Sequence, residues 1–118
     1  MLPAEIKKSK NYFPCDDAKQ ARTKAEEHLK EKAPGSFCFR VSSDATQAFV
    51  VTGKDRNGEI YHTAYRQQDN HYLSHDFNEN CYWSSDPTAP KAQPHAKFEK
   101  IATLIKYFEI LSIQNSDY

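Results

Sequence analysis

The chain has 118 residues, and its 16 Lys plus Arg balance its 16 Asp plus Glu, so the formal net charge is zero. This length suits one domain with one core, and the neutral balance excludes a field strong enough to hold bulk nucleic acid or an anionic membrane. Seven Phe, seven Tyr and one Trp supply large apolar side chains for that core.

No continuous apolar stretch reaches the roughly 18 residues that a membrane-spanning helix requires, and residues 1–10 lack the apolar centre of a signal peptide. The cysteines, Cys15, Cys38 and Cys81, form no CxxC pair. This argues against a disulfide framework and favours a reducing compartment. We therefore expect a soluble, cytoplasmic protein that makes no membrane contact.

The first regular element is expected after residues 1–10, which we interpret as a linker. Asp16 or Asp17 is a suitable N-cap for a helix that runs to about Lys32, where an Ala-Pro-Gly sequence ends it. Small apolar residues recur within it at helical spacing. They are Ala18, Ala21, Ala25 and Leu29.

Alternating residues then predict an antiparallel sheet. Residues 36–43 place phenylalanines on one face and polar residues on the other. Residues 49–54 and 59–66 flank an Asp-Arg-Asn-Gly turn at 55–58, which is a strong hairpin signal. Residues 71–74 form a short, fourth strand.

The last two segments are a long loop at about 74–97 and a helix that follows it. The loop contains three prolines and several aromatic residues, and loops of this length are usually functional or disordered. The helix is predicted from apolar residues at helical spacing: Phe98, Ile101, Leu104, Ile105 and Phe108. Residues 11–118 therefore predict an α+β fold, a central antiparallel sheet flanked by two α-helices.

Arg40 does not fit such a core. If helices cover both faces of the sheet, its side chain points into protein, where an unpaired charge is costly. Ser42 shares its face, and Ser43 and Thr46 make the following turn rich in hydroxyl groups. A guanidinium matches phosphate oxygens bidentately, so this cluster suits one small anion. The alternative is an internal ion pair with one of three carboxylates, Asp16, Asp17 or Glu26.

The segment Gly35–Ser42 (GSFCFRVS) resembles the signature strand of the Src homology 2 (SH2) domain, a phosphotyrosine-binding module. Three further segments agree with this family in order and spacing. They are the aromatic pair Tyr12-Phe13, the strand sequence Ile60-Tyr61-His62 and the apolar pattern of residues 98–108.

The resemblance implies a phosphotyrosine pocket. Arg40 matches the phosphate-binding arginine, Ser42 a hydroxyl that also contacts phosphate, and His62 the histidine beside the tyrosine ring. Arg22 matches a second arginine on the first helix, with Lys19 as the alternative. Ser43 and Thr46 belong to the phosphate-binding loop, in which Asp44 shapes the turn. The peptide-contacting residues of the long loop and its flank are expected to be Tyr72, Tyr82 and Trp83. The alternative for Tyr82 and Trp83 is that they pin the long loop to the domain.

Four departures from the family pattern narrow the expectation. Asn11 replaces a tryptophan, Ala64 replaces a lysine over the tyrosine ring, the loop at about 74–97 is much longer than usual, and only ten residues follow Phe108. This combination resembles bacterial, Legionella-type effector SH2 domains with weak sequence selectivity. The implied partners are tyrosine-phosphorylated proteins of a host cell cytoplasm, bound by a monomer.

Other functions have weaker support. Four residues offer a Cys-His pair or zinc ligands, but they lie in no nucleophile motif and have loose spacing. They are His71, His75, Cys81 and His95. An RNA-binding sheet would need exposed Phe37 and Phe39 and a basic stripe. We expect no catalysis, cofactor, metal or nucleic acid. The main alternative is an SH2-like interaction domain that does not require phosphotyrosine.

Overall fold

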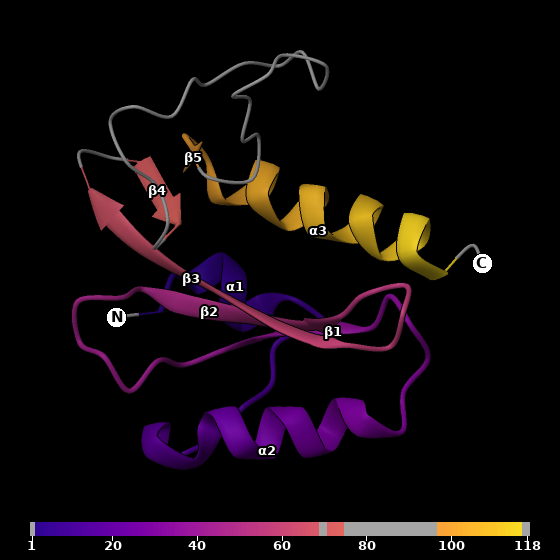
Figure 1. The fold of residues 1–118 in the computed structure, drawn as a ribbon. Helices are drawn as coiled ribbons and strands as arrows, with labels where there is room; N and C mark the ends of the chain where they lie inside the picture. The colour runs from indigo at the N-terminus through magenta and orange to yellow at the C-terminus, as the bar shows by residue number, and fades with distance from the viewer. Residues whose placement is uncertain (1, 69–70, 75–96, 117–118) are drawn as a thin grey trace.

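The computed structural model describes residues 2–68, 71–74 and 97–116. It contains three helices and five strands (Figure 1). In chain order they are α1 (Ala4–Lys8), α2 (Ala18–Lys30), β1 (Phe37–Arg40), β2 (Phe49–Lys54), β3 (Ile60–Gln68), β4 (His71–Ser74), β5 (Lys97–Phe98) and α3 (Ile101–Ser116).

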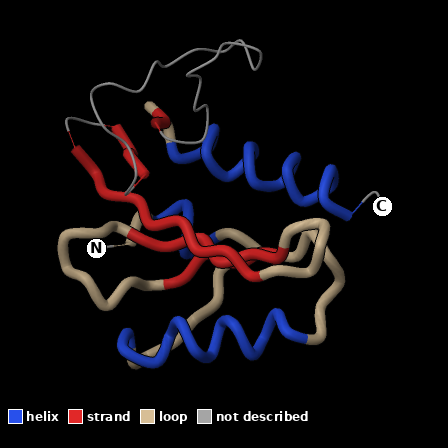
Figure 2. Tube along the Cα trace, viewed as in Figure 1, coloured by secondary structure: helices blue, strands red, loops and turns tan. Residues whose placement is uncertain are grey.

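The strands form one antiparallel sheet in the order β1-β2-β3-β4-β5, so each strand pairs with its neighbours in sequence (Figure 2). Helix α2 lies on one side of the sheet and α3 on the other (Figure 1). The predicted α+β class, with an antiparallel sheet between two helices, is confirmed.

Helix α2 begins as the sequence predicts and ends two residues before the expected position. The Asp17 side chain accepts a hydrogen bond from the Lys19 backbone N–H at 3.0 Å, which caps the first turn. At the other end, Lys54 Nζ donates to the carbonyl oxygens of Lys30 (2.8 Å) and Lys32 (3.0 Å). A lysine on β2 thus satisfies carbonyls that the helix leaves without partners.

The face toward α3 holds the main apolar core, which is largely aromatic. Phe39 lies edge-on to both Phe49 and Phe108, with ring centroids 6.1 and 6.3 Å apart. Tyr65 stacks on Phe49 at 5.4 Å. Such ring pairs add about 0.5–1.5 kcal/mol each to the burial of apolar area, so this face is where the domain gains most of its stability.

The structure differs from the sequence prediction at the first ten residues. Residues 4–8 form helix α1 instead of a linker, and Ile6 is 0% exposed within the main core. Leu2 packs against the same core one helical turn earlier. Because three lysines follow Ile6 within residues 7–10, the segment has the composition of a solvated linker even though one side of it is buried.

A second difference is at the start of the last helix. Phe98 lies in β5, where it pairs with Tyr72 of β4, and the helix begins only at Ile101. Phe98 still packs into the same core. Its helical spacing from Ile101 therefore predicted its burial correctly and its secondary structure wrongly. The helix continues past Phe108 to Ser116. Residues 75–96 lie outside the described residues.

Within the described part of the chain, no helix has the length and apolar character needed to cross a membrane.

Candidate functional site

Arg40 ends β1 with its side chain on the face toward α2, where it is 5% exposed. Its Nε donates to Thr52 Oγ1 at 2.8 Å, Nη1 donates to the Val41 carbonyl at 3.3 Å, and Nη2 lies 3.3 Å from His62 Nδ1. Burial lowers the pKa of this guanidinium, but an arginine in a protein remains protonated. Arg40 is therefore a buried cation.

The expected alternative of an internal ion pair is not found. Among residues 2–68, 71–74 and 97–116, no carboxylate lies within ion-pair distance of Arg40. The three hydrogen bonds use three of its five N–H groups. One N–H on each terminal nitrogen is left, and these two groups form the fork that binds an oxyanion.

His62 lies on β3 and links Arg40 to helix α2. Its Nδ1 is 2.9 Å from Thr52 Oγ1, and its Nε2 is 2.9 Å from Glu26 Oε1. Burial is the main cause that lowers the pKa of His62, and the neighbouring Arg22 and Arg40 lower it further, against the opposing effect of Glu26. The imidazole is therefore neutral at pH 7.

Glu26, at the edge of the site, contacts both His62 and Arg22. The same oxygen that pairs with His62 also accepts from Arg22 Nε at 3.1 Å. The Arg22 hydrogen bond is the largest of the causes that lower the pKa of Glu26. Because the Arg22 side chain is 68% exposed, this pair is largely solvated and contributes little to stability.

The turn after β1 is held by its own side chains. Ser42 Oγ donates to Gln47 Oε1 at 2.6 Å and accepts from the Asp44 backbone N–H at 3.0 Å. Asp44 Oδ1 accepts from the backbone and the hydroxyl of Thr46, at 2.9 and 2.7 Å. These bonds lower the pKa of Asp44. The carboxylate thus acts within the turn.

Residues of α2, of strands β1, β2 and β3 and of the turn after β1 line a hollow of about 550 Å³. It brings together three cations, Lys19, Arg22 and Arg40, with only one carboxylate, so it is locally positive although the whole chain is neutral. The complete lining is Ala18, Lys19, Arg22, Arg40, Ser42, Ser43, Asp44, Gln47, Val50, His62 and Ala64.

Most of the predicted site residues meet in this hollow, and two of the described ones do not. Thr46 is absent from the lining because its hydroxyl is turned onto Asp44. Tyr72 instead packs near Phe49 at the main core, with ring centroids 6.1 Å apart. Tyr82 and Trp83 lie outside the described residues.

Sequence reasoning missed Thr52, Gln47 and Val50. Thr52 shares the α2-facing side of the sheet with Arg40 and His62, and it is 0% exposed. Alternation along residues 49–54 places Thr52 on a face, but only the register between strands places it beside Arg40.

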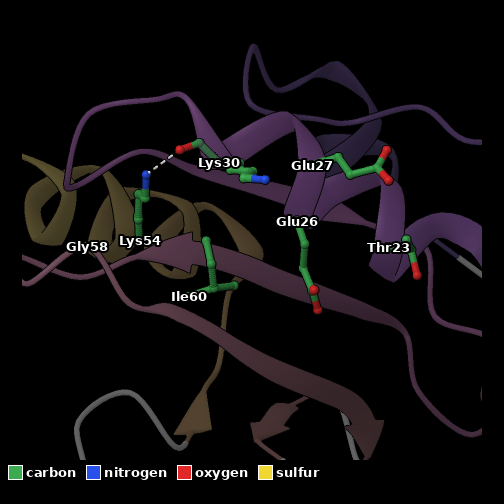
Figure 3. A pocket seen from close by; sticks show the side chains of 7 residues that line it. All are labelled: Thr23, Glu26, Glu27, Lys30, Lys54, Gly58 and Ile60. Atoms are coloured by element: carbon green, nitrogen blue, oxygen red, sulfur yellow. Dashed lines mark hydrogen bonds between the residues drawn. The ribbon is translucent and has the colours of Figure 1, made fainter.

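A second, smaller hollow lies farther along the same helix, between α2 and the β2–β3 hairpin (Figure 3). It measures about 370 Å³ and has a mixed lining of two acids, two lysines and Ile60. Lys54 on its wall is already committed to helix carbonyls. Because its charges balance, this hollow does not concentrate positive potential as the first one does.

The alternative zinc site gains no support from the described residues, in which no three His, Cys, Asp or Glu side chains gather. His75, Cys81 and His95 lie outside those residues. Cys15 and Cys38 are free thiols, and burial raises the pKa of Cys38 to about 11. Its sulfur is therefore protonated and unreactive at neutral pH.

A three-layer α+β domain with a positive hollow between α2 and its sheet has the architecture of a small binding module. The model of the family described as SH2 domain matches residues 17–108, and the chain belongs to that family. SH2 domains are modules that bind peptides or proteins. The expected family is therefore confirmed.

Among solved structures, the chain is similar to the SH2 domain of RavO from Legionella pneumophila, determined as the apoprotein. The TM-score is 0.53 at 17% sequence identity, and the match covers 96% of this chain and 87% of that one. At this identity the similarity supports the fold alone. None of the curated proteins matches the sequence.

Proposed function

We propose that this SH2 domain binds phosphotyrosine in peptides, with the phosphate held by Arg40 at the base of the hollow. One observation carries the proposal. A buried guanidinium, without a carboxylate partner in the described part of the chain, has two unused N–H groups and lines a cavity whose other charges are mostly positive. A dianionic phosphate is the ligand that best compensates such a charge.

The remaining lining assigns further contacts. Ser43 faces the hollow, and its hydroxyl has no hydrogen-bond partner among the described residues, so it is better placed to donate to phosphate than Thr46. Ser42 reaches the phosphate if it gives up its bond to Gln47. Arg22 on α2, or Lys19 as the alternative, supplies the second cation at the rim.

The tyrosine ring fits between α2 and β3, beside His62 and over Ala64. Because Arg40 lies at the base, a long aromatic side chain is needed to bring a phosphate to it. Phosphoserine and phosphothreonine are too short, so we expect the site to discriminate against both.

We also propose that the domain has weak selectivity for the residues after phosphotyrosine. Tyr61 faces α3 and lies against Gly53, where even a Cβ atom would meet its ring. Burial raises the pKa of Tyr61 to about 12. Residues 109–116 are helical rather than a loop, so they do not build a wall opposite the sheet.

A role in a bacterial effector that acts on host signalling is consistent with the similarity of fold to the Legionella domain. In this proposal a monomer recognises tyrosine-phosphorylated proteins in the host cytoplasm, and Tyr82 and Trp83 contact the bound peptide.

The deciding experiment is a calorimetric titration of one phosphotyrosine peptide, its unphosphorylated twin and its phosphoserine analogue. We expect binding of the first only. Arg56→Ala, an exposed arginine in the β2–β3 turn, is the matched control and should bind like wild type. Equal binding of the phosphorylated and unphosphorylated peptides would favour an interaction domain that does not require phosphotyrosine.

A further inference from the structure

Thr52 lies in the middle of the sheet, directly opposite Cys38 on β1 and His62 on β3. Arg40 is opposite Val50, so its side chain crosses diagonally to reach Thr52, as long side chains on neighbouring strands do. The hydroxyl of Thr52 is completely buried. It therefore satisfies its hydrogen bonds with side chains and not with solvent.

The direction of each hydrogen bond in this cluster is fixed by the chemistry of Arg40. A guanidinium only donates, so the 2.8 Å contact uses Thr52 Oγ1 as the acceptor. Arg40 Nη2, which also only donates, lies 3.3 Å from His62 Nδ1, so this nitrogen is the unprotonated acceptor, and the Thr52 proton goes to it at 2.9 Å.

The far end of the cluster agrees with this assignment. With Nδ1 as acceptor, the proton of a neutral imidazole is on Nε2, and that nitrogen faces Glu26 Oε1 at 2.9 Å. Nδ1 also faces Arg40 Nη2 at 3.3 Å, which is a second donor. One tautomer thus agrees with every contact from Glu26 to Arg40, with the lone pair of Nδ1 shared between Thr52 and Arg40.

We propose that Thr52 is a positioning residue of the phosphate site, whose buried hydroxyl fixes the plane in which Arg40 presents its two remaining N–H groups. A guanidinium is planar, so holding Nε on Thr52 and Nη2 on His62 determines where the other two N–H bonds point. Without the hydroxyl, Arg40 keeps its charge but loses the bond that sets its orientation.

The proposal rests on the phosphotyrosine function, but part of its test does not. Nitrogen-15 NMR of the unliganded protein reports the His62 tautomer directly, and a slowly exchanging Arg40 Nε–H signal reports the bond to Thr52. We expect the Nε2-protonated tautomer and a protected Nε–H. A wild-type His62 protonated on Nδ1 would overturn the proposal whatever the protein binds.

The binding arm compares Thr52→Val, which keeps the shape and removes the hydroxyl, with Thr52→Ser, which keeps the hydroxyl. Titrated with a phosphotyrosine peptide, Thr52→Val should bind at least tenfold more weakly than wild type, and Thr52→Ser within threefold. The His62 pKa should rise in Thr52→Val only, because the lost hydrogen bond favoured the neutral ring.

A threonine with a purely structural role gives a different result. Thr52→Val would then lower the melting temperature but leave the affinity of the folded protein within threefold and the His62 pKa unchanged, which overturns the proposal. If Thr52→Val does not fold, the proposal is decided by the His62 tautomer and the Arg40 Nε–H signal of the wild-type protein. A wild type that binds no phosphotyrosine peptide refutes the proposed function, while those two signals still decide the role of Thr52.

Discussion

The two faces of the sheet are covered by different kinds of side chain. Toward α3, large aromatic side chains interlock around Phe39 and Phe108. Toward α2, the buried helix residues are Ala21, Ala25 and Leu29, and the space beside them holds the polar cluster around Arg40. The small residues on α2 leave room for a hollow, whereas packed rings fill the core on the opposite face. The domain thus separates the source of its stability from the proposed site of recognition.

The strongest test of this separation is a large-to-small change in the aromatic face. Phe39→Ala should lower the free energy of unfolding by about 3–5 kcal/mol, because it removes a fully buried ring and leaves a cavity. The affinity of the molecules that remain folded should change little. Chemical denaturation and a peptide titration at low temperature measure the two quantities. A tenfold loss of affinity in the folded fraction would show that the faces are not independent.

The converse change is in Arg40. Arg40→Ala should weaken phosphotyrosine binding by about 2–5 kcal/mol, the usual cost of removing one partner of a buried charged contact. The same variant should lose less stability than Phe39→Ala. Arg40→Lys should also bind poorly, because an ammonium cannot reproduce the fork. A folded Arg40→Ala protein that binds within threefold of wild type would refute the role of anchor.

A smaller effect is expected in the pH dependence of the free energy of unfolding, and it arises from His62 on the face toward α2. Because the folded protein holds the pKa of His62 below 6.5, the unfolded chain binds more protons as the pH falls through this range. The free energy of unfolding should therefore be highest above pH 6.5 and decline as the pH falls through the folded pKa of His62. Urea titrations from pH 5 to 8 test this.

A matched pair of variants assigns the effect to its residue. His62→Gln should flatten the decline, whereas His28→Gln, at an exposed position on α2, should leave it in place. An unchanged slope in His62→Gln would exclude His62 as its cause.

The smallest expected effect concerns the residues after phosphotyrosine. A formed specificity pocket penalises a wrong side chain by about 1–3 kcal/mol. With Tyr61 lying over Gly53, we expect substitutions at these peptide positions to change affinity by less than about 1 kcal/mol. A peptide library with one fixed phosphotyrosine measures this, and strong selection at a single position would contradict it.

The sequence was sufficient to predict Arg40, and its resemblance to SH2 domains to predict His62, but not Thr52, which contacts both. Alternation along residues 36–43 placed Arg40 on the opposite face from the phenylalanines, and that inference needed only local geometry. The role of Thr52 depends on the register of three strands, which no local pattern contains. Ile6 was missed for a related reason, since a five-residue helix that ends in two lysines shows too little periodicity to indicate burial. Phe98 was assigned to the core correctly, but strand pairing with β4 replaced its expected helix.

The strand order has a consequence for how the domain folds. Because the sheet is a simple meander, the polar cluster of Arg40, Thr52 and His62 comes from residues 40–62 and requires only two consecutive hairpins. Short loops close at low entropic cost and favour early formation. The bridge between Tyr12 and Phe39 joins more distant segments and is expected to form later. In a kinetic study, substitutions at β2 and β3 should therefore slow refolding, whereas substitutions at Tyr12 should mainly accelerate unfolding.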